Sequence, residues 1–571
     1  MRVLLTAVNA KYIHSNLAVY SLRAYAAMYR DQIEVAEFTI NQQRDYMLQK
    51  IYEKKPDILA FSCYIWNIEL ILALVPDIRL VLPGVKIWLG GPEVSYDGEQ
   101  LMGAHPEISG IMLGEGERSF RAIMEYYLDG RGRLAEIPGI LFREKDGEVK
   151  SGPVETPAPL DLDELPFPYE DLDDFAHRII YYESSRGCPF SCSYCLSSIT
   201  RGVRLRSISL VLRELQFFLD QRVPQVKFVD RTFNCRHDHT MAVWNYILEH
   251  DNGITNFHFE IEADLLREDE LELLSRMRPG LVQLEIGVQS TNARTLEAVN
   301  RRADFSGIAW ACHRLQQAGR QHLHLDLIAG LPWEDMTSFR ESFRMVYHLR
   351  PHELQLGFLK VLKGSGIRQE AGKYGIVSRT RPVYEVLYTR WISFQELLRL
   401  KGVEEMVEIY YNSAQFPNTV AALEPLFENP FDLYDGLAQE YRERQLFDVS
   451  LSRLQRLEVL RDFAHRVGNR SRDWYDSQLL TDWYLRENAK TRPDWAPDLT
   501  GDKSEIGTFY RREEKERIYL REYEGCSWKQ LMHMTHLEPV RNEAGERAGW
   551  RLFDYRRRDP LTGNARMVEI G

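Results

Sequence analysis

The stretch Ser185-Arg-Gly-Cys-Pro-Phe-Ser-Cys-Ser-Tyr-Cys195 brings Cys188, Cys192 and Cys195 together on one short segment. Iron–sulfur clusters are held by cysteine thiolates, and a cubane cluster ligated only by protein uses four of them. Three thiolates leave one iron with an open coordination position, and an open position distinguishes a catalytic metal site from a closed structural one. The C-x3-C-x2-C spacing therefore predicts a [4Fe-4S] cluster with one iron free to bind a ligand.

Two other interpretations of these cysteines are weaker. Zinc would need a distant fourth ligand, for which Cys235 is a candidate, but zinc ribbons usually show two C-x2-C pairs and the sequence has no second pair. A disulfide framework is not expected in a long chain with seven cysteines and no signal peptide.

The spacing, with Tyr194 just before the last cysteine, resembles the signature of the radical S-adenosylmethionine (radical SAM) superfamily. The resemblance implies that the open iron binds the amino and carboxylate groups of S-adenosylmethionine. It also implies that the cluster donates one electron, which cleaves this cofactor into methionine and a 5′-deoxyadenosyl radical.

Size and composition describe an ordinary globular protein. The 571 residues are 44% hydrophobic and 27% charged, long enough for about three or four domains. The net charge of −12 argues against nonspecific binding to a nucleic-acid backbone. The sequence Met-Arg-Val-Leu-Leu-Thr-Ala-Val resembles the start of a strand rather than a signal peptide. No apolar stretch approaches the roughly 20 residues of a membrane span, so we expect a cytoplasmic protein.

Residues 1–130 alternate short apolar runs with amphipathic ones. The expected strands are residues 3–8, 33–38, 58–63, 85–90 and 110–113. Helical patterns fall at residues 15–29, 44–54, 69–80 and 98–102, and from residue 118. This alternation predicts an α/β fold of the Rossmann-like, doubly wound kind, because parallel strands need helical crossovers. Ligands of such sheets bind beyond the carboxyl ends of the strands.

Four segments follow these strand ends: residues 9–16, residues 62–67, Gly90-Gly-Pro-Glu-Val-Ser95 and Gly114-Glu-Gly-Glu117. Their glycines allow a ligand to approach the backbone closely. None is a G-x-G-x-x-G fingerprint, so a nicotinamide or flavin cofactor is not favoured. The alternative is that the domain binds substrate in place of a cofactor, or has no ligand at all, since a fold alone does not imply a function.

Together with the cysteine motif, these segments resemble the cobalamin-dependent radical SAM enzymes, whose N-terminal Rossmann-like domain carries a corrinoid. The D-x-H-x-x-G motif, which supplies the lower cobalt ligand in corrinoid methyltransferases and mutases, is absent. His14 is a candidate substitute, although we expect no protein histidine on cobalt. The resemblance implies the following cobalamin-binding residues: Asn9, His14, Ser62, Tyr64, Gly90, Gly91, Pro92, Glu93, Gly114, Glu115 and Gly116.

Residues 131–178 are rich in proline and acid and predict an extended linker. Residues 179–375 then predict six strand–helix units, which fits the partial (β/α)6 barrel of radical SAM enzymes. The strands are expected at residues 179–184, 226–229, 257–261, 281–288, 322–328 and 354–359. Catalytic residues of such barrels gather at the carboxyl ends of the strands.

The same resemblance implies residues near S-adenosylmethionine: Tyr194, Asp230, Glu285, Gln289, Ser290, Arg301 and Asp326. Arg301 would pair with the carboxylate of this cofactor, unless it only faces solvent. Glu285 would lie near the nucleoside, unless it pairs with a barrel arginine. Cys63 and Cys312 are expected in the core, and so is Cys235, with a role beside substrate as its alternative.

Residues 376–571 predict a mostly helical domain, with helices at residues 384–400 and 451–467. This arrangement resembles a branch of the family that ends in a domain of unassigned function. The cluster Arg556-Arg-Arg558 could contact phosphate. Asp554 and Asp559 reduce the net positive charge of this segment, so nucleic acid is not the expected partner.

The sequence thus predicts an enzyme that uses a [4Fe-4S] cluster, S-adenosylmethionine and cobalamin to methylate an unactivated carbon. Its electrons would come from an external donor such as flavodoxin or ferredoxin. One alternative is a rearrangement or ring closure without methyl transfer, and another is a non-catalytic corrinoid-binding or S-adenosylmethionine-binding regulator. The sequence does not indicate the substrate.

Overall fold

The computed structural model describes residues 1–153, 159–199 and 202–570. The chain forms two compact units, each assembled from several segments. The first unit consists of Met1–Glu285, Leu296–Ala311 and Phe358–Arg390, and the second of Ile286–Thr295, Cys312–Gly357 and Trp391–Gly571.

The first sheet contains five parallel strands in the order β2-β1-β3-β4-β5. They are β1 (Val3–Asn9), β2 (Ile33–Thr39), β3 (Ile58–Ser62), β4 (Lys86–Gly90) and β5 (Ile108–Met112). Every residue of β1 and β3 is buried, as expected for central parallel strands covered on both faces. The strand order reverses between β1 and β3, which is where ligands of such sheets bind.

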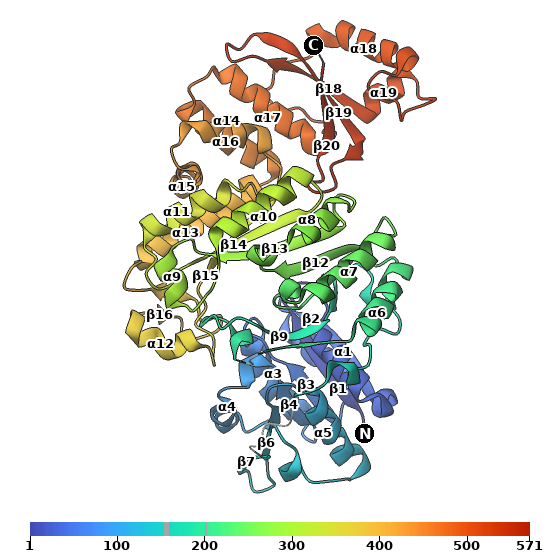
Figure 1. The fold of residues 1–571 in the computed structure, drawn as a ribbon, viewed down its shortest axis with the longest axis vertical. Coiled ribbons are helices and arrows are strands. Elements are labelled where there is room, and N and C mark those ends of the chain that lie inside the picture. The colour runs from blue at the N-terminus through green and yellow to red at the C-terminus, as the bar shows by residue number, and fades with distance from the viewer. Residues whose placement is uncertain (154–158, 200–201, 571) are drawn as a thin grey trace. The chain divides into compact units, whose positions relative to one another are not determined.

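Helices connect these strands (Figure 1): α1 (Leu17–Tyr25), α2 (Arg44–Lys54), α3 (Ile68–Val81), α4 (Gly98–Ala104) and α5 (Glu117–Asp129). Helix α1 contacts α5, and α2 contacts α3. The predicted Rossmann-like fold is therefore confirmed.

The sheet extends into the segment that we had expected to be a linker. Strand β6 (Ile140–Arg143) pairs antiparallel with β5, and β7 (Val149–Ser151) pairs antiparallel with β6 at the edge of the sheet. An edge strand exposes unpaired N–H and C=O groups, and this hairpin pairs those of β5. Strands of three or four residues are too short to show a sequence period, so the prediction missed them. Residues 154–158 of the expected linker lie outside the described residues.

The second sheet has the order β15-β14-β13-β12-β11-β8, which follows the chain. Its strands are β8 (Ile180–Tyr182), β11 (Gln225–Phe228), β12 (Asn256–Ile261), β13 (Val282–Gln289), β14 (His322–Ala329) and β15 (Glu353–Phe358). Strands β8, β11 and β12 are parallel neighbours. The six predicted strands are present, which confirms the predicted α/β sheet of this region, and the boundary between the two units falls inside β13.

A buried ion pair fixes the start of this second sheet. Arg206 donates to Glu214 on α6 (Ile208–Asp220), with 2.6 Å between Nη2 and Oε1. The Tyr182 hydroxyl of β8 donates to the other carboxylate oxygen at 2.6 Å. The side chains of Arg206 and Glu214 are only 7% and 2% exposed, so loss of either partner leaves the other charge buried and uncompensated.

We therefore expect Glu214→Ala to lower the free energy of unfolding by about 3–5 kcal/mol. Glu136→Ala breaks an ion pair with Arg133 whose side chains are 78% and 54% exposed, and exposed pairs contribute only about 0–1 kcal/mol. Thermal unfolding of the two variants measures the difference. Equal melting temperatures would contradict the assignment of Arg206–Glu214 as a structural pair.

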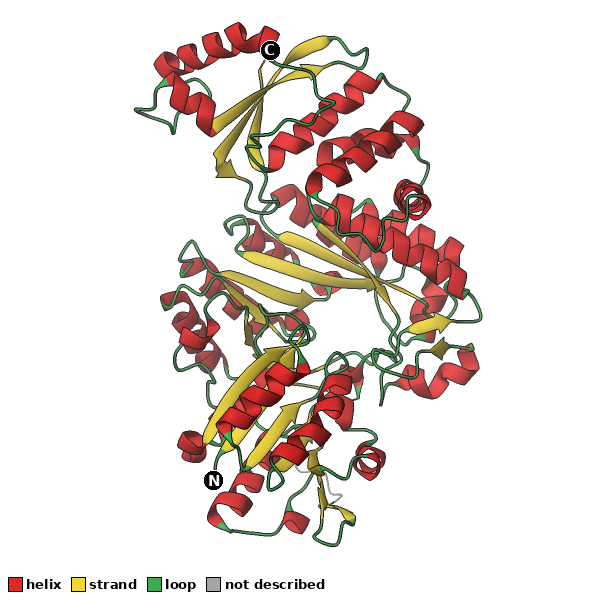
Figure 2. Cartoon of the chain, turned by 180° about the vertical axis from the view of Figure 1, so that it is seen from behind, coloured by secondary structure: helices red, strands yellow, loops and turns green. Residues whose placement is uncertain are grey.

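The second unit contains most of the helical C-terminal region that we expected (Figure 2). Its helices include α13 (Phe394–Val407), α14 (Pro417–Leu423), α15 (Pro430–Glu443), α16 (Arg453–Val467), α17 (Arg472–Arg486), α18 (Lys503–Glu516) and α19 (Trp528–Met534). An antiparallel sheet of β18 (Thr535–Arg541), β19 (Arg547–Arg558) and β20 (Ala565–Ile570) follows.

Helix α13 begins ten residues later than the sequence pattern suggested. Ser393 and Glu396 form a capping box that sets the helix start, and the preceding residues include the short strand β17 (Val386–Tyr388). Among the described residues, no helix has the length and apolar character needed to cross a bilayer.

Candidate active site

The three predicted ligands lie on one loop of the first unit, residues 185–195, which we call the cluster loop. Strand β9 (Ser185–Cys188) pairs antiparallel with β10 (Gly202–Leu205), and Cys188 ends β9 opposite Gly202. The Cys195 N–H donates to the Cys192 carbonyl at 3.1 Å, which closes a turn between them. All three thiols are free, and Cys192 is buried while the other two are half-buried. Three free thiols on one loop can hold three irons of a cubane cluster and leave the fourth open, so the residues fit the predicted cluster.

The other cysteines behave differently. Burial raises the pKa of Cys63 and of Cys312 to about 12, so both remain protonated core residues as expected. Cys235 is only half-buried, so the expectation that it lies in the core is wrong, although burial still raises its pKa. At Cys192 burial raises the pKa too, but the Arg301 guanidinium opposes that shift. A neighbouring positive charge favours the thiolate, which is the form that binds metal.

Gly187 on β9 allows this strand and β10 to approach each other closely. Its φ is +104°, and a Cβ atom there would lie 2.2 Å from the Gly202 carbonyl oxygen. A side chain would therefore meet both backbone strain and a clash with backbone.

Gly187→Ala should displace Cys188 and prevent full loading with iron. Gly103→Ala is the matched control, because a Cβ atom there meets nothing within 4 Å. Anaerobic reconstitution followed by iron quantitation makes the comparison. A Gly187→Ala protein that binds as much iron as the control would show that this close approach is not needed.

Arg301 lies beside the cluster loop. Its Nη1 is 3.9 Å from the Cys192 sulfur, and its Nη2 donates to Glu262 Oε1 at 2.6 Å. The Arg301 side chain is 9% exposed, so it does not face solvent. Burial raises the pKa of Glu262 to about 7, while Arg301 opposes the shift. Glu262 was not among the predicted site residues, although it directly follows β12, where functional residues of such sheets gather.

Asp230 has a supporting position. The backbone N–H of Ser184 donates to its Oδ2 at 3.0 Å, and the Ser184 hydroxyl donates to its Oδ1 at 2.6 Å. Because that hydroxyl donates to Asp230, it accepts the proton of His239 Nε2 at 3.1 Å. Asp230 is 1% exposed, and burial raises its pKa to about 6. The network fixes Ser184 at the entry to β9.

Burial lowers the pKa of His239 to about 4, below the roughly 6.5 of an unfolded histidine. The contribution of neutral His239 to the free energy of unfolding is therefore complete above pH 6.5. As the pH falls toward 4, this contribution decreases by about 1.4 kcal/mol per pH unit. The stability advantage of the wild type over His239→Gln should shrink between pH 7 and pH 5. Thermal unfolding at both pH values measures it, with the exposed His250→Gln as control, and a pH-independent difference would contradict it.

Glu285 lies in a polar layer formed by three strands. It pairs with Lys227 of β11 at 3.0 Å and with His258 of β12 at 2.8 Å. The expected alternative partner was a barrel arginine, whereas these two partners are a lysine and a histidine.

The remaining residues expected near S-adenosylmethionine divide between the two units. Tyr194 lies on the cluster loop of the first unit, and burial raises its pKa. Gln289, Ser290 and Asp326 belong to the second unit. Gln289 ends β13 with a φ of +69°, Ser290 is buried, and Asp326 lies 3.0 Å from His324.

The loop after β1 is held toward the start of β8. Asn9 Nδ2 donates to the His14 carbonyl at 3.0 Å and to Glu37 at 2.9 Å. His14 Nδ1 lies 2.7 Å from the Tyr181 hydroxyl, and burial lowers its pKa. One ring nitrogen of His14 is therefore engaged by Tyr181.

The loops after β3 and β5 provide the features that a large planar cofactor needs. Beyond the buried Ser62, the rings of Tyr64 and Trp66 stack with centroids 4.4 Å apart, and Trp66 is exposed. Gly114 has a φ of +68° with nothing within 4 Å of its Cβ position, and Gly116 precedes α5. An exposed aromatic surface and an open glycine cradle fit a corrin ring.

The loop after β4 has a different character. Gly91 has a φ of +110°, and its Cβ position is 2.6 Å from the Cys63 carbonyl oxygen. Gly90 hydrogen-bonds to Cys63, and Pro92 begins a short 3-10 turn. Glu93 is 3% exposed and pairs with Lys363. Gly91 thus allows backbone to pack on backbone, whereas the Cβ position of Gly90 faces the Met112 side chain at 3.2 Å.

Three family models match the chain in order. The B12 binding domain matches residues 3–124, the radical SAM superfamily residues 182–346, and a protein of unknown function (DUF4080) residues 372–549. The chain therefore contains a B12-binding domain followed by a radical SAM domain. The predicted cobalamin-binding and radical SAM domains are thereby confirmed, together with the cofactors that define them.

Curated relatives share part of this arrangement. The chain is 27% identical over 334 residues to 2-(S-pantetheinyl)-carbapenam-3-carboxylate methyltransferase of Streptantibioticus cattleyicolor, covering 52% of this chain and 46% of the relative. It is 24% identical over 361 residues to the anaerobic magnesium-protoporphyrin IX monomethyl ester cyclase of Rubrivivax gelatinosus, covering 61% and 64%. The match thus spans less than two thirds of each relative.

A solved structure supports the fold. The cobalamin-dependent S-adenosylmethionine radical enzyme OxsB superposes with a TM-score of 0.57 at 16% identity, over 81% of this chain and 75% of that chain.

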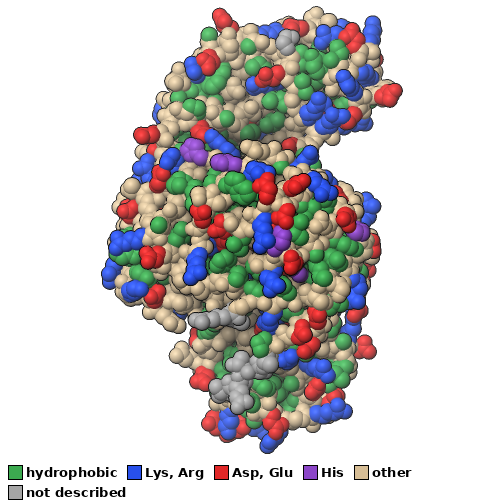
Figure 3. Space-filling view, in the orientation of Figure 1, with side chains coloured by type: hydrophobic (Ala, Val, Ile, Leu, Met, Phe, Trp, Pro, Cys, Tyr) green, Lys and Arg blue, Asp and Glu red, His purple; other side chains and the backbone are tan. Residues whose placement is uncertain are grey.

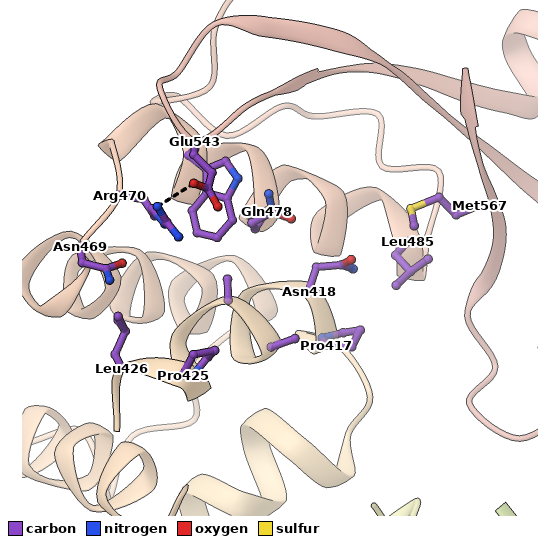
Figure 4. A pocket seen from close by; sticks show the side chains of 13 residues that line it. Pro417, Asn418, Pro425, Leu426, Asn469, Arg470, Gln478, Leu485, Glu543 and Met567 are labelled. Atoms are coloured by element: carbon purple, nitrogen blue, oxygen red, sulfur yellow. Dashed lines mark ion pairs between the residues drawn. The ribbon is translucent and has the colours of Figure 1, made fainter. Parts of the chain in front are cut away.

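The second unit contains an open cavity of about 650 Å³ (Figure 4). Helices α14 and α17 line it, and the ion pair of Arg470 with Glu543, 2.6 Å apart, lies at its edge. Trp474 and Gln478 contribute from α17. We assign no ligand to this cavity.

The basic cluster at residues 556–558 is engaged in protein contacts. Arg557 pairs with Glu522, while Arg556 and Arg558 donate to backbone carbonyls. On the face that Figure 3 shows, acidic and basic side chains are interspersed.

Proposed function

We propose that this protein is a cobalamin-dependent radical SAM methyltransferase that acts on an unactivated carbon and takes electrons from an external donor such as flavodoxin or ferredoxin. One observation carries the proposal. The three free thiols of the cluster loop and the strand-end loops of the B12-binding domain lie in the same compact unit. A carbapenam methyltransferase among the relatives supports methyl transfer as the reaction class.

The bound cofactors would supply a radical that abstracts hydrogen and a methyl group for the resulting carbon. The residues of the chain bind and orient them. Cys188, Cys192 and Cys195 would hold the cluster, and Arg301 places positive charge beside Cys192. With Glu262 as its buried partner, Arg301 keeps one orientation, which pre-organises the site.

Ring closure without methyl transfer is the second candidate, because a relative is a protoporphyrin monomethyl ester cyclase. The two candidates differ in their products. Methyl transfer consumes two molecules of S-adenosylmethionine and yields both 5′-deoxyadenosine and S-adenosylhomocysteine. Ring closure yields 5′-deoxyadenosine alone.

Anaerobic reconstitution with iron, sulfide and hydroxocobalamin should load about four irons and one corrinoid per chain. Cys188→Ala should lose the iron and keep the corrinoid, because the two cofactors use different loops. Iron and corrinoid quantitation with the visible spectrum measures both. Iron without corrinoid would overturn the cobalamin assignment and return the first domain to substrate binding.

Product analysis then separates the reaction classes. The reduced, loaded protein is incubated with S-adenosylmethionine labelled at its methyl group and with pools of candidate substrates. Label in a new product, with both nucleosides formed, supports methyl transfer. A product without label and without S-adenosylhomocysteine supports ring closure. If the Cys188→Ala protein retains the biological effect of the wild type in the cell, the protein is a non-catalytic regulator.

A further inference from the structure

The glutamates of the two glycine motifs in the B12-binding domain are engaged in ion pairs with other parts of the first unit. Glu93 of Gly90-Gly-Pro-Glu93 and Glu115 and Glu117 of Gly114-Glu-Gly-Glu117 each form ion pairs with basic residues from elsewhere in the first unit. Sequence reasoning assigned Glu93 and Glu115 to the cofactor.

Glu93 is the centre of the first group of contacts. Lys363, which follows β15, places its Nζ 3.0 Å from Glu93 Oε1 and 2.8 Å from Asp97. The Tyr384 hydroxyl also donates to Glu93 Oε1. The side chains of Glu93 and Lys363 are 3% and 15% exposed, so solvent screens this pair little.

The segment that carries Lys363 continues to the cluster loop. Gly364 has a φ of +78°, and its Cβ position lies 2.3 Å from the Tyr96 ring, so the backbone rests directly on that ring. Three residues later, the Ile367 N–H donates to the Ser193 carbonyl at 2.8 Å. Ser193 lies between Cys192 and Cys195, so the segment from Lys363 to Ile367 joins the loop after β4 to the cluster loop.

A second group of contacts holds the other end of the cluster loop. Arg186, two residues before Cys188, lies 2.8 Å from Glu117 and 3.4 Å from Glu115. It also pairs with Glu183 at 2.7 Å. Arg204 of β10, the strand paired with β9, forms an ion pair with Glu115 and donates to it again at 3.2 Å.

We propose that Glu93, Glu115 and Glu117 are positioning residues that clamp the B12-binding domain to both ends of the cluster loop and set the cluster-to-corrinoid distance. This inference rests on the proposed function. The clamp consists of the pairs Glu93–Lys363, Glu117–Arg186 and Glu115–Arg204. A radical formed at one cofactor must meet a substrate carbon that also faces the other, and misplacement by 1 Å can cost roughly 100-fold in rate.

Two substitutions test the clamp. Lys363→Met removes the cation but keeps the length of the side chain, and Glu93→Gln keeps the shape and the hydrogen-bond partners. Glu136→Gln is the control, because it breaks an exposed ion pair in the same region of the chain. Each protein is fully reconstituted, and its iron and corrinoid are quantified first.

The decisive readout is the dipolar coupling between the reduced cluster and cob(II)alamin, measured by electron paramagnetic resonance. Both clamp variants should retain iron and corrinoid but show a weaker or broader coupling, whereas Glu136→Gln should match the wild type. Loss of corrinoid in Glu93→Gln alone would overturn the inference, because Glu93 would then bind the cofactor. An unchanged coupling in both variants would overturn it too.

Failure of the proposed function gives a different result. A wild-type chain that binds iron but no corrinoid would overturn that function. Hydrogen exchange at residues 92–97 and at the cluster loop would then decide whether the clamp exists. Faster exchange at both places in Lys363→Met supports the clamp, and faster exchange at neither overturns it.

A charge exchange provides the rescue. Glu115→Arg should weaken the coupling, and adding Arg204→Glu should restore part of it, because the exchanged pair can form again while Arg186, 3.4 Å from Glu115, still repels the new arginine. Failure of the double variant to recover would show that Glu115 acts other than through Arg204.

Discussion

The cluster loop cannot hold three thiolates in place by its own backbone. Between β9 and the turn that follows Cys195 it has little regular structure, so neighbouring segments determine its shape. Gly187 lets β10 approach, the Val299 carbonyl accepts the Ser193 N–H, and Ile367 donates to the Ser193 carbonyl. The rest of the first unit is arranged around this requirement.

Charge is the second means by which this loop is held. Arg301, Arg186 and Lys363 are all largely buried, and each is paired with at least one carboxylate. Buried ion pairs contribute little net stability, because desolvation offsets the attraction, but breaking one is costly. Such pairs therefore suit the selection of one geometry. The Arg206–Glu214 pair has the same role beside Tyr182 at the end of β8.

Much of the fold followed from local patterns. The buried runs of β1, β3 and β14 and the amphipathic helices between strands have periods that a sequence displays, and the predicted strands of both sheets lie within two residues of their positions. Strands β6 and β7 were missed because three or four residues show no period. Helix α13 was placed too early because the capping box at Ser393 was not weighed against the aromatic pattern.

The candidate site divides in the same way. The sequence by itself determined that Cys188, Cys192 and Cys195 share one short segment with the spacing expected of a cluster-binding site, because these features lie within a single loop. It also determined the glycine positions after β4 and β5, since a glycine at a strand end is a local signal. Only the tertiary structure decided the roles of Asp230, Glu262, Glu93 and Glu115, because a carboxylate acts through its partner. Those partners, Ser184, Arg301, Lys363 and Arg204, lie between 39 and 270 residues away along the chain. A local sequence pattern does not reveal which residues so far apart come into contact.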